Sequence, residues 1–160
     1  MDPVLDQIAS HLKLGDFLLK AALEKLSHEE LHRRGGPQSN SLIWIAGHLA
    51  LSRSRMLKLA GGEADFAWTD LFSRGSAVQD PTVYPELDKI LQSWEKTSGL
   101  LLTALPKMTP EQLFAKSPQS LPGDDKSVRG ALSFLVSHEA YHIGQMGYLR
   151  KMLGYESLVG

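Results

Sequence analysis

The sequence predicts an all-α protein in which four long amphipathic helices pack as a single four-helix bundle. Apolar residues in the long segments recur every three or four positions, which is the helical period, and strand-like alternation is not found. The eight prolines leave the stretches 4–36, 38–80 and 123–160 uninterrupted. A length of 160 residues with 42% hydrophobic content suits one domain over residues 1–160.

The first two long helices are predicted over residues 3–26 and 40–60. Pro3 suits the first position of a helix, and the glycine pair 61–62 supplies a stop for the second. The second helix is apolar on almost all sides between residues 42 and 51, so we expect it to be buried on most sides. The stripe of the first helix comprises Leu5, Ile8, Leu12, Gly15, Leu19, Ala22 and Leu26.

The third and fourth helices are predicted over residues 83–105 and 126–153. Gly154 is a suitable residue to end the fourth helix. The candidates for the cap at its start are Asp124, Asp125 and Ser127. The stripe of the third helix comprises Tyr84, Leu87, Leu91, Trp94, Ser98, Leu101 and Leu105.

Two longer connections join these helices. Residues 61–82 contain Phe66, Trp68 and Phe72, and this segment is too aromatic for a free linker. We therefore expect it to fold over the bundle. The connection after the third helix holds four prolines, with a short helical turn predicted near residues 109–115.

Composition excludes several classes of protein. The absence of cysteine rules out disulfides, zinc–thiolate sites, iron–sulfur clusters and a thiol nucleophile. The net charge of −1 provides no field that would attract nucleic acid or an acidic membrane. No apolar run approaches the ~18 residues of a membrane span. The start lacks the profile of a secretory signal, so we expect a cytoplasmic protein.

The strongest functional signal lies in the fourth helix. His138, His142 and Gln145 are consecutive positions of its stripe, with apolar residues on both sides. A buried imidazole needs partners for its nitrogens, and the i,i+4 spacing directs both rings to one spot, where a metal ion can bind. The alternative is a pair of hydrogen-bonded core histidines. The full stripe comprises Val128, Ala131, Leu135, His138, His142, Gln145, Leu149 and Met152.

A third histidine, His48, lies in an apolar stretch near the middle of the second helix. His138 and His142 straddle the middle of the fourth helix, so the three imidazoles can meet at one level of the bundle. Three neutral imidazoles leave a divalent site with a charge of +2 and with open coordination positions. Such a site is typical of a catalytic rather than a structural metal.

The sequence contains two H-E-x-x-H segments, at 28–32 and 138–142. The first follows Ser27, which forms a capping-box pattern with Glu30, and its helix is short. We therefore interpret His28 and His32 as part of a solvated first turn and the second segment as the metal site.

A zinc metalloprotease is the least favoured interpretation of the second segment. The glycine and histidine of the metzincin extension are replaced by Gln145 and Tyr148, and the only downstream glutamate is Glu156. No sheet is predicted that would hold an extended peptide.

Three segments of the chain match the pattern of a known family, namely Leu26–Arg34, Asn40–Ala50 with its His48, and the ending His138-Glu-Ala-Tyr-His142-Ile-Gly-Gln145. Through these segments the chain resembles the DinB-like (YfiT-like) superfamily across essentially its whole length. It implies a four-helix bundle with a long crossover connection, a homodimer, and a divalent metal on His48, His138 and His142. Family members include thiol-dependent transferases and isomerases, and others are called metal-dependent hydrolases.

Four further residues are candidates for the site. Glu139 follows a ligand and is either a general base or a solvated glutamate. Arg55 either binds an anionic substrate or extends to the surface. Trp44, one turn before His48, either walls the pocket or packs in the core, and Gln145 is either a partner of His142 or an ordinary buried amide.

The leading hypothesis is a metal-dependent enzyme acting on a small molecule, in which the metal activates a thiol cofactor or water. The reaction would be S-transfer or isomerisation with a low-molecular-weight thiol, and hydrolysis with water. Zinc and nickel are the first candidates for the metal, followed by iron and manganese. The alternative is a non-catalytic metal-binding bundle protein.

Overall fold

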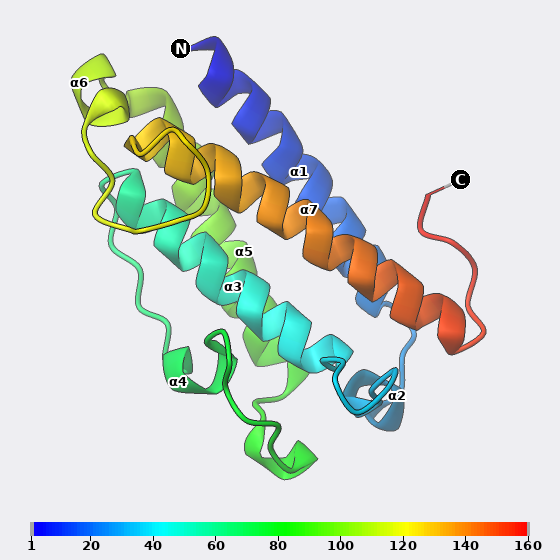
Figure 1. Ribbon diagram of the computed structural model, residues 1–160. Coiled ribbons are helices and arrows are strands. Elements are labelled where there is room, and N and C mark those ends of the chain that lie inside the picture. Colours follow the sequence, from blue (N-terminus) through cyan, green and yellow to red (C-terminus); the bar gives the residue numbers. More distant parts are fainter. Residues whose placement is uncertain (1, 160) are drawn as a thin grey trace.

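The computed structural model describes residues 2–159 and confirms the four-helix bundle. Its long helices are α1 (Pro3–Leu23), α3 (Leu42–Leu59), α5 (Leu87–Ala104) and α7 (Val128–Met152), and they form one elongated bundle (Figure 1). Each lies within its predicted range: the helices begin up to four residues after the predicted start and end one to three residues before the predicted end. No strand is formed within residues 2–159, where only two isolated bridges occur.

The helices α1 and α7 run in one direction, and α3 and α5 run in the opposite direction (Figure 1). Because α3 and α5 are parallel, the chain must return along the bundle between them. Residues 60–86 make this crossover, which includes the short helix α4 (Thr69–Phe72) and the 3₁₀ turn η1 (Pro81–Val83). The order up, down, down, up brings α3 beside α7, although 68 residues separate them along the chain.

Local sequence signals explain where the helices begin and end. The side chains of Asp2, Ser41 and Ser127 accept backbone hydrogen bonds at the starts of α1, α3 and α7. Gly154 adopts a φ of 93° after α7, a conformation that glycine tolerates without strain. The first helix ends at Leu23, earlier than predicted, because the chain turns through a positive φ at Lys25.

Two short helices complete the chain. The helix α2 (His28–His32) begins with the predicted capping box, in which Ser27 and Glu30 satisfy each other's backbone N–H groups. The helix α6 (Pro110–Phe114) lies where the helical turn was predicted. No helix in residues 2–159 is long and apolar enough to cross a membrane.

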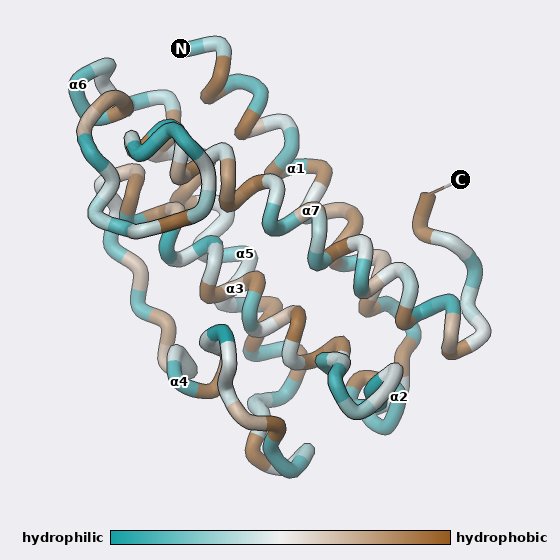
Figure 2. The backbone as a smooth tube through the Cα atoms, viewed as in Figure 1, coloured by the Kyte–Doolittle hydropathy of each residue, from teal (hydrophilic) through white to brown (hydrophobic). Residues whose placement is uncertain are grey.

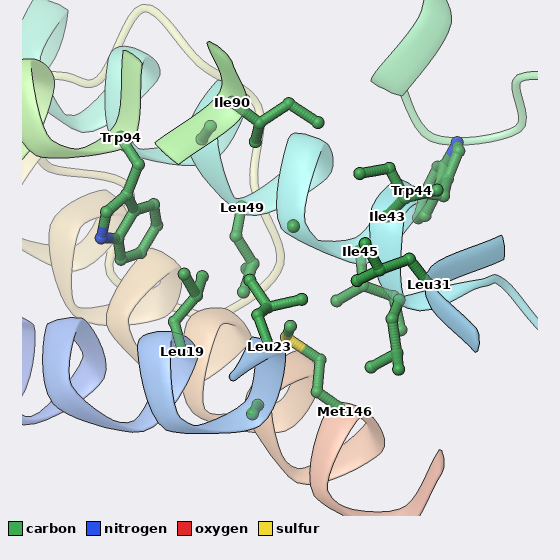
Figure 3. Close-up of a cluster of buried hydrophobic side chains, with 14 of the residues drawn as sticks. Leu19, Leu23, Leu31, Ile43, Trp44, Ile45, Leu49, Ile90, Trp94 and Met146 are labelled. Atoms are coloured by element: carbon green, nitrogen blue, oxygen red, sulfur yellow. The ribbon is translucent and has the colours of Figure 1, made fainter. Parts of the chain in front are cut away.

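Hydrophobic residues recur in bands along all four long helices (Figure 2). In the core, Leu19 and Leu23 of α1 face Leu49 of α3 and Met146 of α7 (Figure 3). As predicted, α3 is buried on most sides, because it contacts α5 and α7 and is covered by the crossover. Met152, assigned to the stripe of the fourth helix, is instead 55% exposed at the last turn.

The crossover aromatics are buried within the chain. Phe72 has no exposed surface, and Phe66 and Trp68 pack partly buried against the same core. The prediction that the connection folds over the bundle is therefore confirmed. These side chains do not need a second subunit to cover them.

Candidate metal centre

The structure brings the three predicted ligands together between α3 and α7. The Nε2 atom of His138 lies 3.2 Å from that of His48 and 3.1 Å from that of His142. His48 and His142 are buried, and His138 is half-buried. Histidine, cysteine, aspartate and glutamate side chains can all bind a metal. Within residues 2–159, these three histidines are the one group of three such side chains whose ligand atoms all lie within 4.8 Å of one another.

Two of the rings are held by hydrogen bonds from their other nitrogen. Nδ1 of His48 donates to the backbone carbonyl of Phe72 at 2.7 Å, and Nδ1 of His142 donates to Oε1 of Gln145 at 2.7 Å. Since both acceptors are carbonyl oxygens, the proton of each neutral ring is on Nδ1. The lone pairs on the two Nε2 atoms therefore both point toward His138.

A divalent metal ion fits this arrangement. Three nitrogens about 2.1 Å from one tetrahedral zinc lie about 3.4 Å apart. The Nε2 atom of His138 lies at nearly this distance from the Nε2 atoms of His48 and His142, at 3.2 and 3.1 Å. Without a cation, lone pairs face one another, because His138 can donate its Nε2–H to only one of the two neighbours. Nδ1 of His138 has no hydrogen-bond partner in the part of the chain that the structure describes. The donor set, three neutral imidazoles, suits zinc, nickel and iron.

Burial keeps the ligands in the form that binds a metal. Burial lowers the pKa of His48 from 6.5 to about 4, and the charge of Arg55 adds to the effect. Burial and the two neighbouring histidines lower the pKa of His138 to about 4 as well. The pKa of His142 is also lowered by burial. All three imidazoles are therefore neutral at pH 7.

The other H-E-x-x-H segment gathers no third ligand. The rings of His28 and His32 lie 4.4 Å apart between centroids, on the short capped helix α2. No such cluster of three ligands forms around them in residues 2–159. The distinction between the two segments drawn from their sequence context agrees with this geometry.

Trp44 and Gln145 both contact ligands. Trp44 is buried and stacks on His48, with 4.8 Å between ring centroids, while its Nε1–H donates to Ser76. Gln145 accepts from His142 and donates through Nε2 to the hydroxyl of Tyr141. Both side chains therefore fix the orientation of a predicted ligand.

Arg55 is half-buried, and its charge acts on two of the three ligands. It lowers the pKa of both His48 and His138. Its backbone carbonyl accepts a hydrogen bond from Gln119 in the connection before α7.

Glu139 is only 3% exposed, so the interpretation as a solvated glutamate is wrong. Its carboxylate accepts two hydrogen bonds from Arg53, at 2.8 and 2.7 Å. Burial raises the pKa of Glu139, and the bonds and charge of Arg53 act against that rise. Arg53 was missed in the sequence, because it lies in the polar stretch 52–55 near the end of α3 and no local pattern marks it as buried.

A groove adjoins the centre one helical turn away. Its walls include Ile45, three residues before His48, and Gln145, three residues after His142. The loop before α3 closes its other side, and its volume is about 520 Å³. Its lining is uncharged and comprises Gly35, Gln38, Ser39, Asn40, Ile45, Tyr141, Gly144, Gln145, Tyr148, Leu149 and Met152.

The fold and the site define a class of protein, namely four-helix bundles with a three-histidine centre between two helices. The chain belongs to the DinB superfamily, whose family model matches residues 17–146. A search among curated proteins found no match.

Solved structures share the fold. A conserved protein from Enterococcus faecalis superposes with a TM-score of 0.72 at 16% identity, covering 94% of this chain and 97% of the other. YfiT from Bacillus subtilis superposes with a TM-score of 0.66 at 22% identity, covering 95% of this chain and 89% of YfiT. YfiT is described as "a probable metal-dependent hydrolase with an unusual four-helix bundle topology".

Proposed function

We propose that this protein is a metal-dependent enzyme that acts on a small molecule. The observation that carries the proposal is the convergence of three Nε2 atoms from His48, His138 and His142, two of them on rings whose Nδ1 protons are already bound. When bound, a divalent metal lowers the pKa of a thiol or of water and supplies a nucleophile at neutral pH. Zinc or nickel is the first candidate, followed by iron or manganese.

In this proposal, the residues of the chain bind the metal, orient its ligands and receive the substrate. The three neutral imidazoles hold the metal without cancelling its charge, and Gln145 and the Phe72 carbonyl keep two of the rings in place. The uncharged groove beside Gln145 receives the small-molecule substrate. Because the chain has no cysteine, a thiol nucleophile would come from a low-molecular-weight thiol, and the reaction would be S-transfer or isomerisation. With water, it would be hydrolysis, in line with the description of YfiT.

The geometry of Glu139 argues against proteolysis. In an H-E-x-x-H protease, the glutamate is the general base beside the metal. Here both carboxylate oxygens of Glu139 are bound to Arg53. An extended peptide would also lack a strand on which to pair within residues 2–159.

The proposal is tested with purified protein whose metal content is measured by plasma mass spectrometry. We expect one divalent ion per chain. Low-molecular-weight thiols are then screened with electrophilic acceptors, and ester and amide substrates are screened in parallel for hydrolysis. We expect turnover in one of the two screens, lost with a chelator and restored by one equivalent of metal. Bound metal without turnover in either screen would favour the non-catalytic alternative, and absence of metal binding would contradict both.

We also propose a homodimer, as the resemblance to the DinB-like superfamily implies. Sedimentation at micromolar concentration should give a species of twice the 17.6 kDa chain. A single species of 17.6 kDa would contradict the dimer without affecting the metal proposal.

A further inference from the structure

Arg53 connects all four long helices from the centre of the bundle. Its guanidinium is completely buried, and each of its five N–H groups donates a hydrogen bond. Two go to Glu139 of α7, two go to α1, and one goes to Ser98 of α5. The acceptors on α1 are the Leu12 carbonyl and the Asp16 carboxylate, each at 2.8 Å.

Two further contacts fix the plane of this guanidinium. Its central carbon lies 3.9 Å from the centroid of the Trp94 ring, on α5. The hydroxyl of Ser98, which accepts from Arg53, donates in turn to Asp16 at 3.2 Å. Arg53 therefore has one orientation, and the Glu139 carboxylate is held in a bidentate pair against it.

The same two helices carry the metal centre. Glu139 follows the ligand His138 directly, and Arg53 lies five residues after the ligand His48. Successive residues of a helix differ by about 100° around its axis, so the pair and the ligands lie on different faces. Helices α3 and α7 are thus joined at two places around their axes, by Arg53 with Glu139 and by His48 with His138.

We infer that Arg53 and Glu139 are positioning residues for the metal centre, because their buried pair fixes the rotation of α7 against α3. This inference rests on the proposed metal site. A helix rotates as a unit over one turn, so a shift of Glu139 also moves His138 and His142 relative to His48. The pair does not contact the substrate or the metal, and it acts through the backbone of α7.

Gly15 of α1 provides a way to disturb the pair without removing a charge. A Cβ atom at this position would lie 2.0 Å from Oε1 of Glu139 and 3.1 Å from an Nη atom of Arg53. Glycine in the middle of a helix lowers its stability relative to alanine, so its presence here reflects the space that the pair needs. Gly99 of α5 is the matched control, because a Cβ there meets nothing within 4 Å.

The test compares Gly15→Ala with Gly99→Ala for zinc affinity, measured by competition with a chromophoric chelator. The visible absorption of the cobalt(II)-substituted protein reports on ligand geometry. We expect Gly15→Ala to weaken zinc binding about tenfold and to change the cobalt spectrum. Gly99→Ala should leave both as in the wild type. All measurements are made well below the melting temperature of each variant.

Two milder variants keep the test decisive if Gly15→Ala does not fold. Glu139→Gln keeps the size of the side chain, and Asp16→Asn changes a partner of Arg53 that is 27% exposed. Both should weaken zinc binding, Glu139→Gln more than Asp16→Asn, since only Glu139 is on α7. A lower melting temperature with unchanged affinity and spectrum would show a structural role alone and overturn the inference. If the wild type itself binds none of the divalent metals, the proposed function fails first.

Discussion

At the scale of single residues, a histidine's second ring nitrogen prepares it to bind a metal. His48 and His142 each donate Nδ1–H to a carbonyl oxygen, so each presents an unprotonated Nε2. His32 differs, because within residues 2–159 it does not belong to a group of three ligand atoms that all lie within 4.8 Å of one another. The two H-E-x-x-H segments therefore have the same spacing of histidines, but only the second contributes to a group of three ligand atoms.

The first prediction concerns which histidines bind the metal. Single changes His48→Ala, His138→Ala and His142→Ala should each weaken binding sharply, because each removes one of three ligands. The double change of His28 and His32 to alanine should keep one ion per chain. Metal content by plasma mass spectrometry checks both. Loss of metal in the double variant with retention in His48→Ala would mean that the wrong segment was chosen.

The second prediction concerns the partner of His142. Gln145→Leu should weaken metal binding about 10- to 100-fold, because the Nδ1–H of His142 loses its acceptor. Gln145→Glu should retain binding, since a carboxylate accepts the same bond. Tyr141→Phe is the control, because it removes only the outer hydrogen bond of Gln145. Chelator competition measures all three, and equal affinity in Gln145→Leu and wild type would contradict the assigned role.

At the scale of elements, the crossover contributes to the metal centre although it supplies no side-chain ligand. The short helix α4 places the backbone carbonyl of Phe72 beside His48, which donates a hydrogen bond to it. The ring of Phe72 is fully buried and packs over α3. This close approach depends on Gly47, where a Cβ would lie 2.3 Å from the Phe72 ring. The crossover is thus joined to α3 next to a metal ligand.

The third prediction follows from this contact. Gly47→Ala should lower the free energy of unfolding by about 1–3 kcal/mol, because the Phe72 ring must move in a packed core. Metal affinity should fall as well, since the carbonyl that orients His48 moves with the ring. Thermal unfolding and zinc titration check the two effects, with Gly99→Ala as the control. If Gly47→Ala is less stable but binds zinc with unchanged affinity, the crossover does not contribute to metal binding.

At the scale of the whole molecule, the bundle lowers the pKa of the histidines at the candidate site. Two of the three imidazoles have a pKa of about 4, because the surrounding helices exclude water. The ordinary value is 6.5, so between these limits the unfolded chain binds more protons than the folded one. The free energy of unfolding of the metal-free protein therefore falls as the pH is lowered through this window.

The fourth prediction is this loss of stability in acid. The melting temperature of the chelator-treated protein should fall between pH 7 and pH 4.5, and His138→Gln should show a smaller decrease. His11→Gln, which changes an exposed histidine, should behave as the wild type. In the metal-loaded protein, acid should also release the ion, because protons compete for the same nitrogens. A pH dependence in His138→Gln equal to that of the wild type would contradict the assignment.

The sequence by itself determined the helices and the three histidines that meet between α3 and α7. Periodic apolar stripes and local caps act over a few residues, so Ser27 and Gly154 could be predicted as helix ends directly, and Ser127 was one of three candidates for the start of α7. The convergence of the three histidines was predictable for a similar reason. Polar residues that interrupt the apolar pattern of a helix must find partners, and His48, His138 and His142 do so together.

Only the tertiary structure decided what surrounds those histidines. The Phe72 carbonyl and the Arg53–Glu139 pair depend on contacts between residues 24 and 86 positions apart, which no local pattern encodes. Glu139 shows the difference. The sequence left it as a general base or a solvated residue. The face of α7 on which Glu139 lies is buried only because α1 and α3 pack against it, and the sequence pattern of α7 alone does not show this packing. Side-chain identity is local, whereas burial and partnership are properties of the packed bundle.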